Sequence, residues 1–411
     1  AFPSSELSAL QALYVGTGGT DWVWSSAFGH WEFVGDPDPC IDEWEGVECN
    51  SECETISSTC TVTELYLPSY NLVGTLSESL SLLSSLVKLE LNDNELSMTI
   101  PSSLGSLTNL NHLLLYRNEL VGTIPSSLGS LVALKQLGLY DNFLTGAVPS
   151  SFGSLVALEY LQLQSNSLSG VMPTSLGDLS NLLDLYLQIN RFTGVIPSSF
   201  GLLVNLIDFD VYSNHLHGPL PSSLGMLSKL KYLYAYENEL SMTIPASLGS
   251  LSNLLGLDLY TNKLTGTIPT SLGAQEGMGK LETLELSSNE LSGTIPSSLG
   301  LLTALVDLYI QFNVLSGGIP SAFGLLTNMQ AVILNNNMLT GTIPPELGYA
   351  VSLQNLILDY NSLSGTIPRW IGSLTLSVEI VLNVNRLSGS IPSTFGSLTR
   401  LQELYLFSNQ L

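Results

Sequence analysis

Positive charge is scarce in this sequence. Its 411 residues include only 11 Lys and Arg against 35 Asp and Glu, so the formal net charge at pH 7 is −24. A surface of this charge repels phosphate backbones and anionic lipid headgroups, which argues against nucleic acid as a partner. Long apolar runs are also missing, because Ser, Thr, Asn and Gly interrupt them well before the roughly 18 residues that a membrane span requires. We therefore expect no insertion of this segment into a membrane.

Residues that carry catalysis or bind metals are equally few. The chain has four His and four Cys, and it contains no nucleophile elbow, phosphate-binding loop or zinc motif. We therefore predict that the protein is not an enzyme and holds no metal or other cofactor. All four Cys lie between residues 40 and 60, at spacings unlike those of a zinc site. This confinement favours disulfides, and so a secreted or cell-surface protein.

A repeat of 24 residues fills most of the chain. The pattern L-x-L-x-x-N-x-L ends each turn on an Asn, here called a ladder asparagine, and one step of 27 residues separates Asn262 from Asn289. Tyr70 holds the equivalent slot of the first turn, which makes 15 strand-bearing turns, the last cut off at Leu411. This period and leucine spacing predict a solenoid to which each turn contributes a short strand. The ladder asparagines are Asn94, Asn118, Asn142, Asn166, Asn190, Asn214, Asn238, Asn262, Asn289, Asn313, Asn337, Asn361, Asn385 and Asn409.

One turn, residues 110–129, shows the physical logic. Asn118 follows the strand, where its amide can satisfy backbone groups of two turns, so stacked copies predict a buried polar ladder. Gly122 permits a backbone conformation that a side chain would hinder, although Met98 and Met242 take its slot in two turns. Pro125 then opens a short helical stretch. The expected core residues of this turn are Leu110, Leu113, Leu115, Leu120, Ile124 and Leu128.

The full turn, L-x-x-L-x-L-x-x-N-x-L-x-G-x-I-P-x-x-L-G-x-L, resembles the plant-type subclass of leucine-rich repeat proteins over residues 62–411. That family includes receptor-kinase ectodomains, polygalacturonase-inhibiting proteins and a plant antifreeze protein. The resemblance implies an α/β solenoid, a right-handed superhelix with a parallel concave β-sheet, lateral second strands from the L-x-G-x-I-P part, and short 3-10 helices on the convex side. Because the chain ends inside a turn, we also expect the natural protein to continue past Leu411.

Residues 1–61 lack the period and are predicted to form an N-terminal cap. A short amphipathic helix is expected to begin near Ser5. Four large Trp side chains can cover the leucine face that the end of a solenoid exposes: Trp22, Trp24, Trp31 and Trp44. The stretch ALQALYVGTGGTDW, with the later C-x8-C that contains WEGVEC, resembles the caps of such repeats in plants, algae and other protists. Three disulfide pairings are open, and short loops favour Cys40 with Cys49 and Cys53 with Cys60.

Tyrosines gather on one predicted surface. Residues that alternate with the buried leucines face the concave side, and 13 of the 16 Tyr fall there. High β-propensity of Tyr is one explanation, and binding through ring faces and hydroxyls is the other. Asp208 and Asp210, with Asp184 one turn earlier, would need a cation or a basic ligand group for compensation. The candidate ligand-binding residues are Tyr116, Tyr140, Tyr160, Asp184, Tyr186, Asp208, Asp210, Tyr212, Tyr232, Tyr234, Tyr236, Asp258 and Tyr260.

These observations predict an extracellular recognition module that binds a peptide, a protein or a neutral glycan on the concave face, with a co-receptor or self-association as further partners. The alternative is a structural scaffold or spacer of the extracellular matrix or cell wall. A minor alternative is ice binding through Ser and Thr of the lateral strands, an array that Ala147, Val171 and Val195 interrupt. The pairs in this array are Ser97 with Thr99, Ser241 with Thr243, Thr265 with Thr267, Ser292 with Thr294, Thr340 with Thr342 and Ser364 with Thr366.

Overall fold

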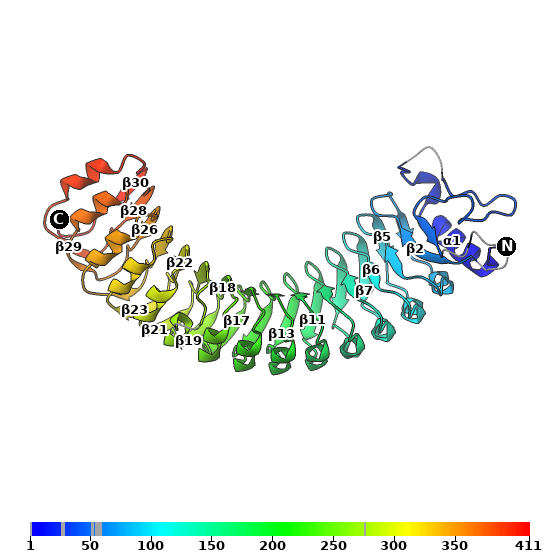
Figure 1. Cartoon of the computed structure of the whole chain (residues 1–411), viewed down its shortest axis with the longest axis horizontal. Coiled ribbons are helices and arrows are strands. Elements are labelled where there is room, and N and C mark those ends of the chain that lie inside the picture. Colours follow the sequence, from blue (N-terminus) through cyan, green and yellow to red (C-terminus); the bar gives the residue numbers. More distant parts are fainter. Residues whose placement is uncertain (1, 26–28, 51–52, 54–59, 275–276) are drawn as a thin grey trace. The chain divides into compact units, whose positions relative to one another are not determined.

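The computed structural model describes residues 2–25, 29–50, 53, 60–274 and 277–411. The chain divides into two compact units, Ala1–Ser199 and Phe200–Leu411, here called the N-terminal and C-terminal units. Each is built from turns stacked side by side, with their short helices lined up along one side (Figure 1). No helix in the described ranges is long and apolar enough to cross a membrane.

Parallel strands of three to five residues, one from each turn, form the main sheet of each unit. Their leucines point into the core, and the alternating side chains form the surface that we call the variable face. In the N-terminal unit the strands follow one another as β1 (Val47–Cys49), β2 (Val62–Tyr66), β4 (Lys88–Glu90), β6 (His112–Leu114), β8 (Gln136–Gly138), β10 (Tyr160–Gln162) and β12 (Asp184–Tyr186), all parallel except the β1–β2 pair. In the C-terminal unit they are β14 (Asp208–Asp210), β16 (Tyr232–Tyr234), β18 (Gly256–Asp258), β20 (Thr283–Glu285), β22 (Asp307–Tyr309), β24 (Ala331–Ile333), β26 (Asn355–Ile357), β28 (Glu379–Val381) and β30 (Glu403–Tyr405).

A second strand in the turns pairs laterally with its neighbours, as the family resemblance implies, with one interruption between Leu339 and Ser364. The N-terminal unit has β3 (Val73–Thr75), β5 (Glu95–Met98), β7 (Glu119–Thr123), β9 (Phe143–Gly146), β11 (Ser167–Val171) and β13 (Arg191–Gly194). The C-terminal unit has β15 (His215–Gly218), β17 (Glu239–Thr243), β19 (Lys263–Thr267), β21 (Glu290–Thr294), β23 (Val314–Gly317), β25 (Met338–Leu339), β27 (Ser364–Thr366) and β29 (Arg386–Ser388).

Short 3-10 helices follow the Pro of nearly every turn, because Pro fixes φ and has no N–H to lose at a helix start. In the N-terminal unit they are η3 (Glu78–Leu82), η4 (Ser102–Ser106), η5 (Ser126–Ser130), η6 (Ser150–Ser154) and η7 (Thr174–Asp178), while η8 (Ser198–Leu202) contains the division between the units. The C-terminal unit has η9 (Ser222–Met226), η10 (Ala246–Ser250), η11 (Thr270–Gly273), η12 (Ser297–Leu301), η13 (Ser321–Leu325), η14 (Pro345–Tyr349), η15 (Arg369–Ser373) and η16 (Ser393–Ser397). The predicted solenoid class is confirmed.

Most of the ladder asparagines are buried, and they join consecutive turns. Asn118 is 7% exposed, and its amide nitrogen donates to the carbonyl oxygens of Leu115 and Tyr116 at 3.1 and 3.3 Å. It also donates to the carbonyl oxygen of Leu91 in the preceding turn at 3.0 Å, and its amide oxygen accepts the N–H of Leu96 at 2.9 Å. One side chain therefore satisfies four backbone groups, and the predicted polar ladder is confirmed.

The glycine slot of the lateral strand has a left-handed backbone. Gly122 has a φ of +79°, and a Cβ placed there would lie 2.8 Å from the methyl carbon of Thr99 in the preceding turn. Met98 and Met242 adopt φ angles of 64° and 69° in the same slot, which L-amino acids rarely do. The threonine methyl of one turn thus packs on the glycine of the next, so the lateral Thr residues have a structural role.

The N-terminal segment contains the helix α1 (Ser4–Gly16) and the short helix η1 (Gly19–Asp21). Trp22, Trp31 and Trp44 are at most 5% exposed, and the rings of Trp22 and Trp31 lie 5.0 Å apart at 70°. Glu6 is buried too, and its carboxylate accepts the N–H of Val62 at 2.8 Å, which ties α1 to the start of β2. The boundary between a cap of residues 1–61 and repeats of 62–411 stays a prediction.

Two disulfides staple this segment. They join Cys40 with Cys49 and Cys53 with Cys60, the pairing that the short loops favour, and no cysteine is free. The alternative of a zinc site would require these thiols as ligands. Both bridges close loops of fewer than ten residues, so their stabilisation by chain entropy lies at the lower end of the usual range.

The 27-residue step leaves both sheets in register. Asp258 still pairs with Glu285 across β18 and β20, one turn apart. Asn289 accepts the N–H of Leu264 at 3.0 Å and donates to the carbonyl oxygen of Leu259 at 3.0 Å, as the other ladder asparagines do. In the sequence, the three extra residues fall between η11 and Leu281.

Candidate functional site

The variable face of the N-terminal unit carries a stacked pair of tyrosines. The rings of Tyr116 and Tyr140 lie 4.3 Å apart at 6°, so each covers one face of the other. The guanidinium of Arg117 lies 5.9 Å from the centre of the Tyr140 ring. It also pairs with Asp93 at 3.3 Å and with Asp141 at 3.5 Å. This cation is thus held between tyrosine and carboxylates of the chain itself.

The other predicted residues of this unit lie on neighbouring strands. Tyr160 pairs in register with Asp184, and Gln162 pairs with Tyr186, across β10 and β12. All five predicted side chains of the unit are half-buried. The unit therefore presents them on one face, as the alternation of the strand predicts.

Three rows of side chains cover the variable face of the C-terminal unit. The first row runs Asp208, Tyr232, Gly256, Thr283 and Asp307, in register from strand to strand. The second row runs Asp210, Tyr234, Asp258, Glu285 and Tyr309. The third row, at the ends of the strands, begins with Tyr212, Tyr236 and Tyr260. Aromatic rings and carboxyl groups are therefore interleaved on one surface.

The third row is a continuous stack. The rings of Tyr212 and Tyr236 lie 4.3 Å apart at 9°, and those of Tyr236 and Tyr260 lie 4.3 Å apart at 12°. Both faces of Tyr236 are thereby covered. This corrects one expectation, because the sequence favoured open ring faces for stacking on a ligand. The stack instead offers ring edges and hydroxyl groups, which donate and accept hydrogen bonds.

Two leucine-rich repeat family models match the sequence of these turns. A leucine rich repeat model matches residues 132–192 and 351–411, and a second one matches residues 85–107, 109–131 and 280–302. The comparison with curated protein sequences finds no match.

Solved structures extend the likeness. The chain is similar to PEPR1 in the PEPR1–AtPEP1 structure, with 35% identity and a TM-score of 0.79 over 84% of this chain and 48% of that one. It is similar to the plant peptide hormone receptor RGFR1 in complex with RGF2, with 32% identity and a TM-score of 0.76 over 84% and 62%. It is also similar to the Arabidopsis receptor kinase HAESA in complex with the peptide hormone IDA and the co-receptor SERK1, with 30% identity and a TM-score of 0.62 over 100% and 82%.

The chain belongs to the plant-type leucine-rich repeat family. It spans about half of the PEPR1 chain and somewhat under two thirds of the RGFR1 chain. RGFR1 and HAESA are receptors, and their similarity supports the prediction that this leucine-rich repeat segment is not an enzyme. The handedness of the superhelix and the kinship of the N-terminal segment with algal caps stay predictions.

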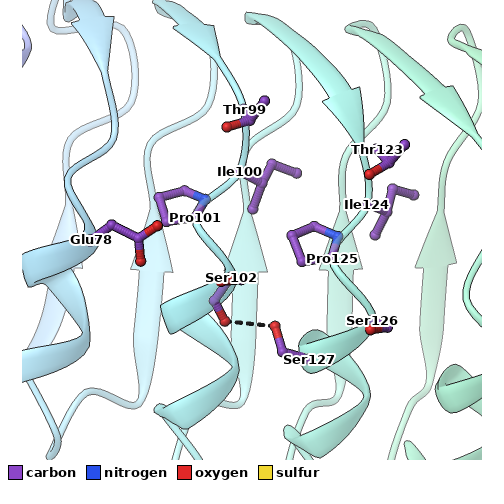
Figure 2. A pocket seen from close by; sticks show the side chains of 10 residues that line it. All are labelled: Glu78, Thr99, Ile100, Pro101, Ser102, Thr123, Ile124, Pro125, Ser126 and Ser127. Carbon is purple, nitrogen blue, oxygen red and sulfur yellow. Dashed lines mark hydrogen bonds between the residues drawn. The ribbon is translucent and has the colours of Figure 1, made fainter.

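A shallow groove lies on the lateral side of the first leucine-rich repeats (Figure 2). It repeats the same Thr, Ile, Pro and Ser side chains from two consecutive turns, beginning at Thr99 and Thr123. The hydroxyl of Ser127 donates to the carbonyl oxygen of Ser102 at 2.6 Å, so this hydroxyl is used between turns. In the lateral array itself, the hydroxyl of Ser97 donates to the carbonyl oxygen of Gly74 at 3.1 Å, and the methyl of Thr99 packs on Gly122. The relatives give no support to ice binding.

Five residues of the first two C-terminal rows are absent from the predicted site, namely Gly256, Thr283, Glu285, Asp307 and Tyr309. Glu285 follows Asp258 in the second row, and Gly256 follows Tyr232 in the first. Counting back from each ladder asparagine, instead of along a fixed period of 24, aligns Glu285 with Asp258 across the longer leucine-rich repeat. Gly256 gives no such signal, because a glycine on a strand has no side chain to suggest a role.

Burial perturbs the acids of the second row. It raises the pKa of Asp258 to about 6 and, against the hydrogen bonds from Ser287, the pKa of Glu285 to about 7. The negative charge of Asp258 raises the pKa of Glu285 further. Burial, followed by the charges of Asp258 and Asp210, also raises the pKa of Tyr234 to about 12. These acids are costly to ionise in the leucine-rich repeat scaffold.

This cost predicts a stability that falls as pH rises. A carboxyl group whose pKa is raised on folding binds its proton more tightly in the folded state, so stability is lost as pH rises through the window from about 4.5 to 7. The groups that face Glu285 are Asp258 on β18, and Asp307 and Tyr309 on β22. Glu285→Gln should therefore raise the free energy of unfolding at pH 8 by about 1 to 2 kcal/mol, allowing for partial solvent screening.

Urea denaturation of both proteins at pH 4.5 and pH 8 measures this effect. The free energy of unfolding of the variant should equal that of wild type at pH 4.5 and exceed it at pH 8. Glu346→Gln, on the helical side of a turn, is the matched control and should change neither value by more than about 0.5 kcal/mol. A Glu285→Gln protein that is less stable than wild type at pH 8 would show that the ionised carboxylate is stabilising.

Proposed function

We propose that this leucine-rich repeat segment is an extracellular recognition module that binds a peptide on its variable face. The observation that carries the proposal is the interleaving of aromatic and carboxyl side chains in rows across the parallel strands. Side chains fixed on strands lose little conformational entropy when a ligand binds. Similar receptors support the choice of ligand, since RGFR1 is a peptide hormone receptor and HAESA was solved with the peptide hormone IDA.

A peptide suits the geometry of the tyrosines better than a neutral glycan. Sugar rings stack on open aromatic faces, whereas the rings of Tyr212, Tyr236 and Tyr260 cover one another. Their exposed hydroxyls and edges can instead exchange hydrogen bonds with the backbone of an extended chain, which presents a donor and an acceptor at each residue. The neutral glycan is retained as the competing ligand in the experiment below.

The compartment and the partners follow from the same proposal. Two disulfides fit an oxidising compartment, which supports a location outside the cell, secreted or at the cell surface. The HAESA complex contains the co-receptor SERK1. We therefore propose a second protein as a further partner.

A peptide library and a neutral glycan array, both screened with the purified 411-residue chain, test the proposal. We expect peptide hits whose affinity falls at least tenfold in the Tyr212→Ala, Tyr236→Ala double variant, because it removes two members of the stack and their hydroxyls. Isothermal titration calorimetry measures each dissociation constant, and circular dichroism confirms that the variant is folded.

Met226→Ala with Leu301→Ala is the matched control. Both side chains are exposed, at 62% and 49%, on the helical side of their turns, so their removal should leave the affinity unchanged. Peptides that bind the tyrosine double variant as tightly as wild type would overturn the variable-face site. An absence of any peptide or glycan ligand would favour the alternative of a structural scaffold.

A further inference from the structure

Two tyrosines of β16 lean over a glycine of the next strand. The rings of Tyr232 and Tyr234 are 5.7 Å apart at 44°, so they form two inclined walls. A Cβ placed on Gly256 would lie 3.1 Å from both Cε1 and the hydroxyl oxygen of Tyr234 and 3.2 Å from Cδ1 of Tyr232. The missing side chain at Gly256 is therefore what lets the two rings adopt this inclination.

A carboxylate with an unused oxygen lies beside this aromatic pair. Asp258 is two residues after Gly256 on β18, hence on the same face, and it is in register with Tyr234. Its Oδ1 atom is enclosed by protein and has no hydrogen-bond partner among the described residues. Leaving such an atom unpaired costs about 1 to 3 kcal/mol, and more for a charged group. The Asp258 carboxylate therefore has no internal partner at this oxygen in the described part of the chain, which leaves its negative charge poorly compensated.

No cation of the C-terminal unit fills this role. β16, β18 and β20 contain neither Lys nor Arg, and the five ion pairs found in the described part of the chain do not include Asp258 or Glu285. Glu285 lies in register on the other side of Asp258, which adds a second carboxyl group. A cation entering here would relieve the repulsion between the two acids.

The N-terminal unit shows a related combination of groups in a different row, at the ends of its strands. There the guanidinium of Arg117 lies over the ring of Tyr140 and pairs with the carboxylates of Asp93 and Asp141. In the C-terminal unit the residues at the slot of Arg117 include Glu237, Thr261 and Ser288, so tyrosines and carboxylates lack their own arginine. A ligand can supply it.

We propose that Tyr232, Tyr234, Gly256 and Asp258, with Glu285, form a subsite for an arginine side chain of the peptide ligand. The guanidinium lies against the tyrosine rings and pairs with the accessible side of the Asp258 carboxylate, and its second edge faces Glu285. A planar fork of donors suits two neighbouring carboxyl groups and aromatic walls better than the compact ammonium of lysine does. This inference rests on the proposed peptide-binding function and names the side chain that the variable face selects.

Saturation-transfer NMR with N-acetyl-arginine amide as the probe tests the subsite at pH 8 and 0.15 M salt. Its neutral isostere N-acetyl-citrulline amide and its lysine counterpart serve as comparisons. We expect saturable binding of the arginine probe, at least tenfold weaker binding of the citrulline probe, and weaker binding of the lysine probe. Equal affinity for the arginine and citrulline probes, or a preference for lysine, would overturn the assignment of a guanidinium site.

Asp258→Asn should weaken binding of the arginine probe at least tenfold, because the substitution removes the negative charge while keeping the shape of the side chain. Gly256→Val should also weaken it, since the added side chain displaces the two rings. The control Asp178→Asn removes the same charge from an exposed position on the helical side and should have no effect. If Asp178→Asn and Asp258→Asn weaken the probe equally, the attraction comes from net charge alone and the subsite is wrong.

Peptides from the library screen separate this inference from the proposed function. A peptide that depends on Tyr212 and Tyr236 but binds Asp258→Asn and wild type equally would preserve the recognition module and reject the arginine subsite. If the library gives no peptide hits and the arginine probe shows no saturable binding, both the peptide-binding function and the arginine subsite are rejected.

Discussion

Replacing Asn238 by leucine is expected to lower the free energy of unfolding by about 4 kcal/mol. Asn238 donates to the carbonyl oxygens of Val211, Ala235 and Tyr236 at 3.0 to 3.3 Å. Its amide oxygen accepts the N–H of Leu216 in the preceding turn at 3.0 Å. Leucine has a similar volume but satisfies none of these four groups, and Asn238 is 9% exposed, so little water can replace it. Urea denaturation followed by circular dichroism measures the loss.

Asn253→Leu is the matched control for the ladder. Asn253 is on the helical side of the next turn, where it is partly exposed and donates to the carbonyl oxygen of Ser228 at 2.8 Å. Water can replace that hydrogen bond, so the cost should stay below about 1 kcal/mol. If both variants lose the same stability, the polar ladder adds nothing beyond an ordinary surface contact.

Gly249→Ala is expected to cost about 3 kcal/mol, by overpacking between turns. A Cβ at this position would lie 2.2 Å from the carbonyl oxygen of Ser271 in the following turn. Backbone cannot rotate away as a side chain can, so the two turns must separate. The same close approach is found at Gly225 and Gly273, where a Cβ would lie 2.3 and 2.0 Å from a backbone oxygen.

Gly279→Ala provides the comparison, because no atom lies within 4 Å of a Cβ built there. Its φ lies outside the left-handed range, so alanine is admitted without strain. Its thermal midpoint should match that of wild type, whereas the midpoint of Gly249→Ala should fall by several degrees. Equal midpoints for all three proteins would mean that the turns can move apart at no cost.

The sequence predicts the fold well because each turn buries its leucines and satisfies its backbone hydrogen bonds in the same way. The buried leucines alternate with polar residues along the strand, and the ladder asparagine has one effective place to donate its hydrogen bonds. The strand and the short helix after the Pro therefore follow from a single turn such as residues 110–129, whereas the lateral strand was implied by the family resemblance. The disulfide pairing follows from loop length, but only as the favoured one of three pairings.

Some backbone features give no signal in the sequence. The residue before each ladder asparagine has a positive φ, 51° at Arg117, 51° at Glu237 and 49° at Tyr360, although none is glycine. Side-chain type does not predict this conformation. The hydrogen bonds of the asparagine that follows compensate for it, so the strain is distributed over the ladder.

The candidate site was predicted in its position and not in its detailed geometry. Alternation along strands placed Tyr212, Tyr236 and Tyr260 on one surface, but the contact of ring on ring depends on rotamers that the pattern does not fix. The role of Gly256 depends likewise on two neighbouring tyrosines and becomes visible only in three dimensions. Such a role cannot be assigned from one position alone.

The longer turn between Asn262 and Asn289 shows where this architecture accepts new material. Its extra residues leave the strand pairing and the ladder hydrogen bonds in place, since they extend the chain only between η11 and Leu281. The other turns have a similar sequence and local structure after their 3-10 helices. Each of these segments is therefore a suitable insertion point for an epitope tag or a fluorescent reporter. Such fusions would leave the variable face free, which makes this chain a scaffold for biosensors whose read-out and recognition elements occupy opposite sides.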